Sequence, residues 1–256
     1  MNEILKQFPF LQTCFKKYLS WLDRQDHNII EDSDLLIALK NKELERLERL
    51  EACLLDAKRI LSISETDFCN KFGFKNDLLS PDPEKIHDIL AEPLIVIDLD
   101  KHGFSNIEKL PDFIRKAEKK LKAADFTAVL SGRKYAIELK TIRVENNPKP
   151  TPGVPTGNSL IPSWWRAMFR NNVITKIEDK DKRVLKQLTT TKNLLNCYAT
   201  MLVLYTRRLG PSTLMENSDF VEEVRAISGD YPEINAFMIK DYFGSVNFCP
   251  ELKSMT

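Results

Sequence analysis

The hydrophobic positions of the first eighty residues recur at helical spacing. Residues 31–61 read EDSDLLIALKNKELERLERLEACLLDAKRIL, with Ser33 or Asp34 in position to cap a helix N-terminus. One seam of this stretch collects its apolar side chains: Ile37, Leu44, Leu47, Leu50, Leu54, Ala57 and Leu61. We expect one long amphipathic helix here, packed on the helix around residues 3–22 or on a second subunit.

A change of pattern follows the stretch SPDPEK at 80–85, which combines two prolines with turn-forming residues. We place the domain boundary there. The sequence thus predicts a helical N-terminal region, 1–80, for dimerisation or partner binding, and a second domain, 81–256.

Helices alternate with strands in the second domain. The pattern predicts helices over 83–103, 110–121, 179–195 and 218–228, and strands over 124–130, 134–143, 198–208 and 234–243. A segment rich in Pro, Gly and Asn, 144–162, is predicted to be a flexible insertion. Alternation of this kind indicates an α/β fold.

Composition narrows the class of protein. No run of eighteen uncharged residues occurs, so no membrane span is predicted, and five dispersed cysteines favour a reducing cytoplasm over a disulfide framework. Net charge is +1, but residues 111–143 hold nine Lys and Arg against four acids, a local excess of five. Residues 163–192 hold eight against three, again an excess of five. Such segments suit a polyanionic partner.

The strand YAIELKTIR, residues 135–143, carries an unusual polar face. Successive strand side chains point to opposite faces, so Glu138 and Lys140 lie opposite the apolar Tyr135, Ile137 and Leu139. On its own, this pattern is typical of an exposed cross-strand charge pair.

The preceding strand brings a second carboxylate to that face. If Gly132 and Arg133 form a two-residue turn, the numbers of paired residues sum to 265, which places Lys140 opposite Asp125. Asp125 and Glu138 then lie on one face, about 7–8 Å apart at the backbone. Two carboxylates and the carbonyl of Leu139 are ligands suited to Mg²⁺, for which Mn²⁺ can substitute. A metal ion bound in this way would polarise a phosphodiester. Lys140 would then orient the attacking nucleophile or offset the negative charge that develops on the phosphorane.

Asp125, followed after twelve residues by Glu138-Leu139-Lys140, resembles the signature of the PD-(D/E)xK nuclease superfamily, the restriction-endonuclease-like fold. The resemblance implies an αβββαβ core, a mixed central sheet flanked by helices. It also implies a further acid on the first core helix, a place matched by Glu92. A Lys or Gln on the helix after the third strand is matched by Lys186 and Gln187.

The match departs from the family pattern just before Asp125, where Ala124 replaces the expected proline. The literal dipeptide Pro111-Asp112 also precedes Glu138, so Asp112 competes for the role of Asp125. We favour Asp125 because it begins an apolar strand.

Two rival motifs remain in the chain. The stretch LIVIDLDKHG resembles the nucleophile strand of haloacid-dehalogenase-type phosphatases, with Asp98 as nucleophile and Asp100 as acid or base. The dyad His87-Asp88 is typical of metal phosphohydrolases, but the chain has only three histidines.

The sequence therefore predicts a Mg²⁺-dependent nuclease that acts on DNA rather than RNA, as in restriction, phage defence or repair. A catalytically idle nucleic-acid-binding protein of the same fold is the alternative, and the phosphatase is the second. Asp125, Glu138, Lys140 and Glu92 form the predicted catalytic group, and Asp125, Glu138, Glu92 and Leu139 hold the metal. Predicted substrate contacts are Lys186, Gln187, Arg143, Trp165 and Arg166, assisted by a basic helix at 111–122. A homodimer, or a protein partner at the N-terminal helices, is also expected.

Overall fold

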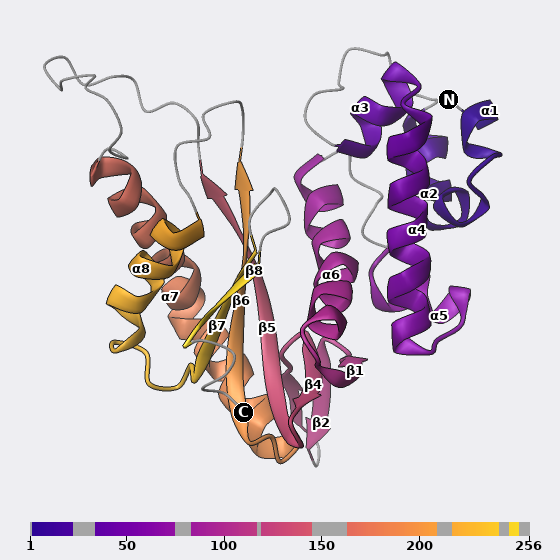
Figure 1. Ribbon diagram of the computed structural model, residues 1–256. Coiled ribbons are helices and arrows are strands. Elements are labelled where there is room, and N and C mark those ends of the chain that lie inside the picture. Colours follow the sequence, from indigo (N-terminus) through magenta and orange to yellow (C-terminus); the bar gives the residue numbers. More distant parts are fainter. Residues whose placement is uncertain are drawn as a thin grey trace, which may run out of the picture. The chain divides into compact units, whose positions relative to one another are not determined.

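The computed structural model divides the chain into two compact units, residues 1–109 and 110–256 (Figure 1). It describes residues 2–22, 34–74, 83–116, 119–144, 163–208, 217–240 and 246–250. The boundary expected at 80/81 and the insertion beyond residue 144 lie outside these ranges. None of the described helices is long and apolar enough to cross a membrane.

The first unit consists of helices followed by one strand. They are α1 (Asn2–Leu5), α2 (Pro9–Leu22), α3 (Asp34–Asn41), α4 (Leu44–Leu61), α5 (Glu65–Lys71), α6 (Pro83–Lys101) and β1 (Ser105–Lys109). Helix α4 packs against α2, α3 and α6. Aromatic rings fill the core, with Phe68 in contact with Phe10, Phe72 and Phe74.

The long helix predicted over residues 34–61 is interrupted. Lys42, between α3 and α4, has a positive φ of 57°, which a continuous helix does not allow. The predicted seam still faces the core over most of α4, since Leu47, Leu54 and Ala57 are fully buried. Leu44, beside the break, is 45% exposed. The predicted helix ending at Gly103 is confirmed as α6, after which Gly103 takes a φ of 84°.

The second unit is a mixed α/β layer. Its elements are β2 (Phe113–Lys116), β3 (Lys119–Lys122), β4 (Phe126–Leu130), β5 (Arg133–Val144), α7 (Ser163–Leu194), β6 (Ala199–Arg208), α8 (Asn217–Ser228), β7 (Ala236–Lys240) and β8 (Val246–Cys249). The α/β class predicted from the sequence is confirmed. Helix α7 is interrupted at Asp179–Lys182, where the backbone angles are not helical.

The larger sheet of this unit has the strand order β4-β5-β6-β7-β8. Strands β5, β6 and β7 are parallel to one another, whereas β4 and β8 are antiparallel to their neighbours. Right-handed crossovers that advance in one direction put α7 and α8 on the same face. Their apolar side chains form one core with Ile142, Leu202, Leu204, Phe237 and Ile239 of the sheet.

The turn between β4 and β5 lies one residue earlier than predicted. Leu130 pairs with Arg133, so Ser131 and Gly132 form the turn and the paired numbers sum to 263. Both turn residues have positive φ, 48° and 76°, as a type I′ turn requires. The predicted register is therefore wrong by two residues. Because side chains alternate with a period of two, each residue keeps its predicted face.

The basic helix predicted over 110–121 does not form. These residues build the antiparallel strands β2 and β3, which form a separate two-stranded sheet. Strand β8, which the pattern did not predict, completes the larger sheet beside β7.

Candidate active site

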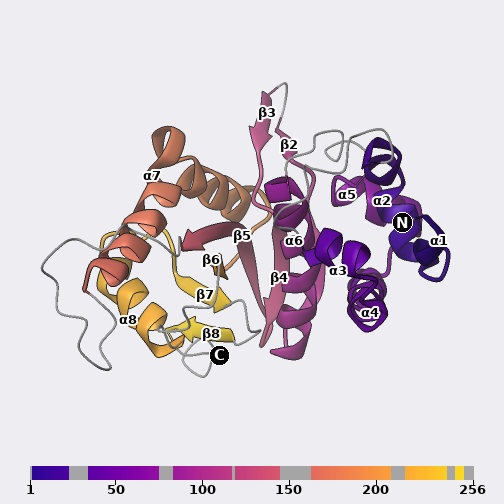
Figure 2. The same ribbon diagram turned by 90° about the horizontal axis from the view of Figure 1, so that it is seen from above.

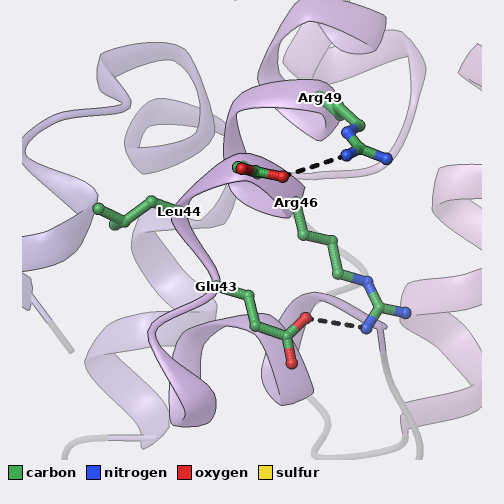
Figure 3. Close-up of a pocket in the computed structure, with 5 residues that line it drawn as sticks. Glu43, Leu44, Arg46 and Arg49 are labelled. Atoms are coloured by element: carbon green, nitrogen blue, oxygen red, sulfur yellow. Dashed lines mark hydrogen bonds and ion pairs between the residues drawn. The ribbon is translucent and has the colours of Figure 1, made fainter.

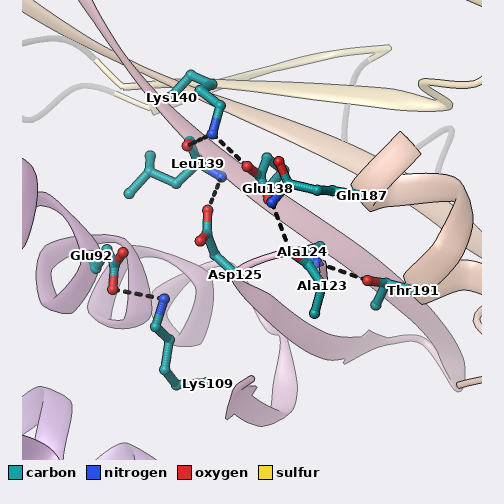
Figure 4. Close-up of polar contacts among 10 residues, drawn as sticks. All are labelled: Glu92, Lys109, Ala123, Ala124, Asp125, Glu138, Leu139, Lys140, Gln187 and Thr191. Atoms are coloured by element: carbon teal, nitrogen blue, oxygen red, sulfur yellow. Dashed lines mark hydrogen bonds and ion pairs between the residues drawn. The ribbon is translucent and has the colours of Figure 1, made fainter. Parts of the chain in front are cut away.

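The candidate site lies where β5 continues past the start of β4. The last backbone pair of the two strands is Phe126 with Ile137. Leu139, two residues further along β5, therefore has no strand partner on that side. Its N–H donates instead to Oδ2 of Asp125 at 2.8 Å (Figure 4). A side chain thus continues the hydrogen-bond ladder and holds the Asp125 carboxylate against β5.

Glu138 lies at the edge of the core rather than on a solvated face. It pairs in register with Leu202, and Lys140 with Leu204, so both belong to the face that α7 and α8 cover. Glu138 is 0% exposed, whereas the side chain of Lys140 is 17% exposed. The strand is thus buried on both faces, and Glu138 is not part of an exposed cross-strand charge pair.

The ammonium of Lys140 contacts both the Glu138 carboxylate and the backbone carbonyl of Leu139. Its Nζ contacts Oε1 of Glu138 and donates to the carbonyl oxygen of Leu139 at 3.1 Å. Since the Leu139 N–H is held by Asp125, one residue's peptide groups connect the Asp125 carboxylate with the Lys140–Glu138 pair (Figure 4). A buried carboxylate needs such a partner because its desolvation is costly.

Helix α7 supports the site through contacts with Glu138 and with the two residues that precede Asp125. Nε2 of Gln187 donates to the carbonyl of Ala123 at 2.7 Å and lies 3.3 Å from Oε2 of Glu138. One turn later, Oγ1 of the fully buried Thr191 accepts the N–H of Ala124 at 2.8 Å. These contacts fix the two residues that precede Asp125.

The amide of Gln187 has a defined orientation. Both neighbours of Nε2 are acceptors, so only the nitrogen can face them. Oε1 of Gln187 is buried and has no hydrogen-bond partner among the described residues. A buried amide oxygen is costly without a partner, and this one is suited to accept from a water or to contact a cation.

The remaining predicted residues have other partners, are exposed, or have side chains outside the described residues. Glu92 belongs to the first unit, where its carboxylate forms an ion pair with Lys109 at 2.8 Å (Figure 4). Lys186 is exposed. Arg166 pairs with Glu222 of α8 at 2.9 Å. Arg143 and Trp165 lie in β5 and α7, but their side chains are outside the described residues. Asp112, the rival of Asp125, is exposed, and its carbonyl accepts the N–H of Ala123.

Sequence reasoning missed Thr191 and the Ala123 carbonyl. Gln187 and Thr191 are four residues apart and therefore share one helix face, a spacing that could have linked them. Nothing in the sequence indicates that their partners are backbone groups of residues 123 and 124.

The donor set of the site fits a divalent cation. Carboxylates of Asp125 and Glu138 and the carbonyl of Leu139 are hard oxygen ligands, and Mg²⁺ commonly takes only one or two carboxylates with water and phosphate. The Lys140 ammonium contacts two of these oxygens, which shows that they converge on a position suited to positive charge. Within the described ranges, no group of three or more His, Cys, Asp or Glu could hold a metal ion.

The strand on which the phosphatase resemblance depends does not form. Asp98 and Asp100 lie within α6, whereas that nucleophile requires the end of a strand. Asp98 is buried, and its carbonyl lies 2.7 Å from Nδ1 of His102, as in a helix C-terminus.

A pocket in the first unit offers no alternative site. Glu43, Leu44, Glu45, Arg46 and Arg49 line it at the start of α4 (Figure 3). Its charged side chains pair with one another, Arg46 with Glu43 at 3.2 Å and Arg49 with Glu45 at 3.3 Å. Hydrogen bonds from Asn41 and Arg46 lower the pKa of Glu43, as expected for a surface carboxylate with donors nearby.

Comparison of the chain with protein-family models, with curated proteins and with solved structures gives no match.

Proposed function

We propose that this protein is a metal-dependent nuclease that hydrolyses phosphodiester bonds in DNA. The observation that carries the proposal is the joint placement of Asp125 and Glu138 around the peptide groups of Leu139, with Lys140 against the same oxygens. A surface charge pair would not account for a fully buried Glu138 or for a carboxylate that replaces a backbone partner.

The order of elements supports the finer fold assignment. Along the chain, α6, β1, β4, β5, α7 and β6 follow the αβββαβ outline that the PD-(D/E)xK resemblance implies. The two carboxylates lie at β4 and β5, the second and third strands of that outline, and Gln187 lies on the helix that follows. Glu92 lies on the first helix of the outline, the place where the resemblance implies a further acid.

Each residue has a defined task in the proposed reaction. Asp125 and Glu138 would hold Mg²⁺ together with the Leu139 carbonyl, and Gln187 would orient Glu138. A bound Mg²⁺ would supply a water of lowered pKa and polarise the phosphodiester. Lys140 would leave the two oxygens it contacts, position the attacking water and offset negative charge on the phosphorane. The basic segments of the second unit would hold the phosphate backbone, so binding should weaken steeply with salt.

One observation favours a second candidate, a catalytically idle DNA-binding protein of the same fold. Glu138 has no exposed surface and is paired with both Lys140 and Gln187. The contacts of this carboxylate with Lys140 and Gln187 must break before its oxygens can bind a metal ion.

Cleavage assays separate the two candidates. Supercoiled plasmid and single-stranded DNA are incubated with Mg²⁺ or Mn²⁺, using the wild type, Glu138→Gln and Lys140→Met. The nuclease proposal expects cleavage by the wild type and its loss in both variants, with Lys6→Met in the first unit as the exposed control that retains it. Binding without cleavage under either metal selects the idle protein. Normal cleavage by Glu138→Gln removes the active-site assignment.

A further inference from the structure

The strands β2 and β3 form a ribbon with one strongly basic face. In register, Phe113 pairs with Lys122 and Arg115 with Lys120, so these four side chains share a face. All four are exposed, Phe113 to 49%. Ile114 and Leu121 pair on the opposite face and are half-buried. The ribbon therefore has one face with a half-buried apolar pair and an outer face of three cations and one aromatic ring.

This outer face does not stabilise the ribbon. Like charges directly opposite one another, such as Arg115 and Lys120, are destabilising, and a two-stranded ribbon is marginal in water. Within the described part of the chain, no carboxylate pairs with Arg115, Lys120 or Lys122. A charge array that weakens the fold and lacks acidic partners is suited to a polyanion.

The base of the ribbon is tied to the candidate active site. The N–H of Ala123 donates to the carbonyl of Asp112 at 2.9 Å and closes the ribbon. The carbonyl of the same Ala123 accepts the bond from Gln187. Leu110, just before the ribbon, donates to the carbonyl of Asp125 at 2.9 Å. Figure 2 shows the ribbon standing away from the larger sheet of this unit.

We propose that the β2–β3 ribbon is a DNA-binding arm that docks on duplex DNA. Arg115, Lys120 and Lys122 contact phosphates, and Phe113 packs against sugars or base edges. The major groove of B-DNA, about 12 Å wide, admits a two-stranded ribbon, and four residues per strand extend about 13 Å. The proposal rests on the proposed function, because a duplex held by the ribbon is brought to the strand segment that carries Asp125.

Binding measured without cleavage tests the arm directly. Anisotropy of a short labelled duplex is titrated with protein in EDTA at several salt concentrations. The variant Arg115→Gln/Lys120→Gln/Lys122→Gln removes three outward charges. Its matched control, Lys6→Gln/Lys42→Gln/Lys101→Gln, removes three exposed charges from the first unit. Thermal unfolding of both variants checks that the fold is retained.

We expect the ribbon variant to bind about tenfold more weakly, or worse, at ~0.1 M salt, and its salt slope to fall by about 2.7, or 0.9 for each of three phosphates. The control should bind as the wild type does. Phe113→Ala should weaken binding without changing the slope. An unchanged slope in the ribbon variant, an equal loss in the control, or a loss seen only with a single-stranded probe would overturn the proposal.

Cleavage in Mg²⁺ separates this proposal from the nuclease proposal. If the wild type binds DNA through the ribbon but does not cleave it, the nuclease proposal is overturned and the proposal of a DNA-binding arm stands. A ribbon variant that binds and cuts as the wild type does overturns the arm and leaves the nuclease.

Discussion

The carboxylate of Asp125 accepts the backbone N–H of Leu139 at 2.8 Å, immediately beyond the last backbone pair of β4 and β5. This bond ties the residue at the start of one strand to the residue between Glu138 and Lys140 in the next. Because the partner is a backbone group of β5, the sheet itself helps to position the Asp125 carboxylate. With the carboxylate already in place, less reorganisation free energy is needed in the reaction step.

In the proposed nuclease, the Asp125 side chain has a structural and a chemical task that two substitutions separate. Asp125→Asn keeps an oxygen that can accept the Leu139 N–H, so its stability should stay close to that of the wild type. Asp125→Ala leaves the N–H unpaired and should lose about 1–3 kcal/mol of unfolding free energy. Both variants should lose cleavage, because an amide is a poor ligand for Mg²⁺. Urea unfolding and plasmid nicking measure the two effects. An Asn variant that cuts DNA normally contradicts the metal-binding role.

Glu138 and Lys140 should be strongly coupled in stability. Lys140→Met leaves the carboxylate buried without its ammonium and should cost about 3–5 kcal/mol at neutral pH. In the double variant Glu138→Gln/Lys140→Met no buried charge remains, so much of that loss should be recovered. A double-mutant cycle by urea unfolding measures the coupling. Losses that simply add would show that the pair is solvated and not buried as described.

Alternation and flanking turns were enough to predict the central strands. Strands β5 and β6 and helix α8 carry apolar side chains at the spacing of a strand or a helix. These side chains are buried in one core, which confirms the three predicted elements. The register of β4 with β5 depended on which two residues form the turn, and Ser131 with Gly132 was mistaken for Gly132 with Arg133. In the sequence only Gly132 indicates a residue with positive φ, because a serine such as Ser131 rarely adopts it. The second residue of the turn therefore has no sequence signal.

The ribbon shows where local propensity was misleading. Residues 110–121 are rich in Arg, Lys, Ala and Glu, which favour helix, yet the segment is extended. Tertiary contacts decide the outcome, because Ala123 closes the ribbon on Asp112 and β3 packs against α7. These partners are distant in sequence or belong to the backbone. The burial of Glu138 was missed for a related reason, since only the assembled α7 shows that its face is covered.

Thr191 should fix the Ala124 backbone through a single bond. Thr191→Val preserves shape but removes the acceptor for the Ala124 N–H, so it should lose about 1–3 kcal/mol of unfolding free energy. Thr191→Ser keeps the hydroxyl and should lose less, through the missing methyl alone. If Asp125 is positioned through Ala124, the Val variant should also cut DNA more slowly than the Ser variant at a temperature where both are folded. Urea unfolding and single-turnover cleavage provide the two measurements, and equal values for Val and Ser would exclude this role.

Tyr231 should make stability depend on pH in the alkaline range. Burial, followed by the 3.0 Å hydrogen bond to Glu178, raises the pKa of Tyr231 from 10 to about 12. A folded pKa above the unfolded value means that this contribution is fully present below pH 10 and is lost as pH rises towards 12. Tyr231→Phe should therefore show a flatter loss of unfolding free energy than the wild type between those values. Glu178→Gln keeps an acceptor but removes the charge, so its loss should begin at lower pH. Urea unfolding at pH steps from 9 to 12 measures all three proteins, and parallel curves for the wild type and Tyr231→Phe would contradict the assignment.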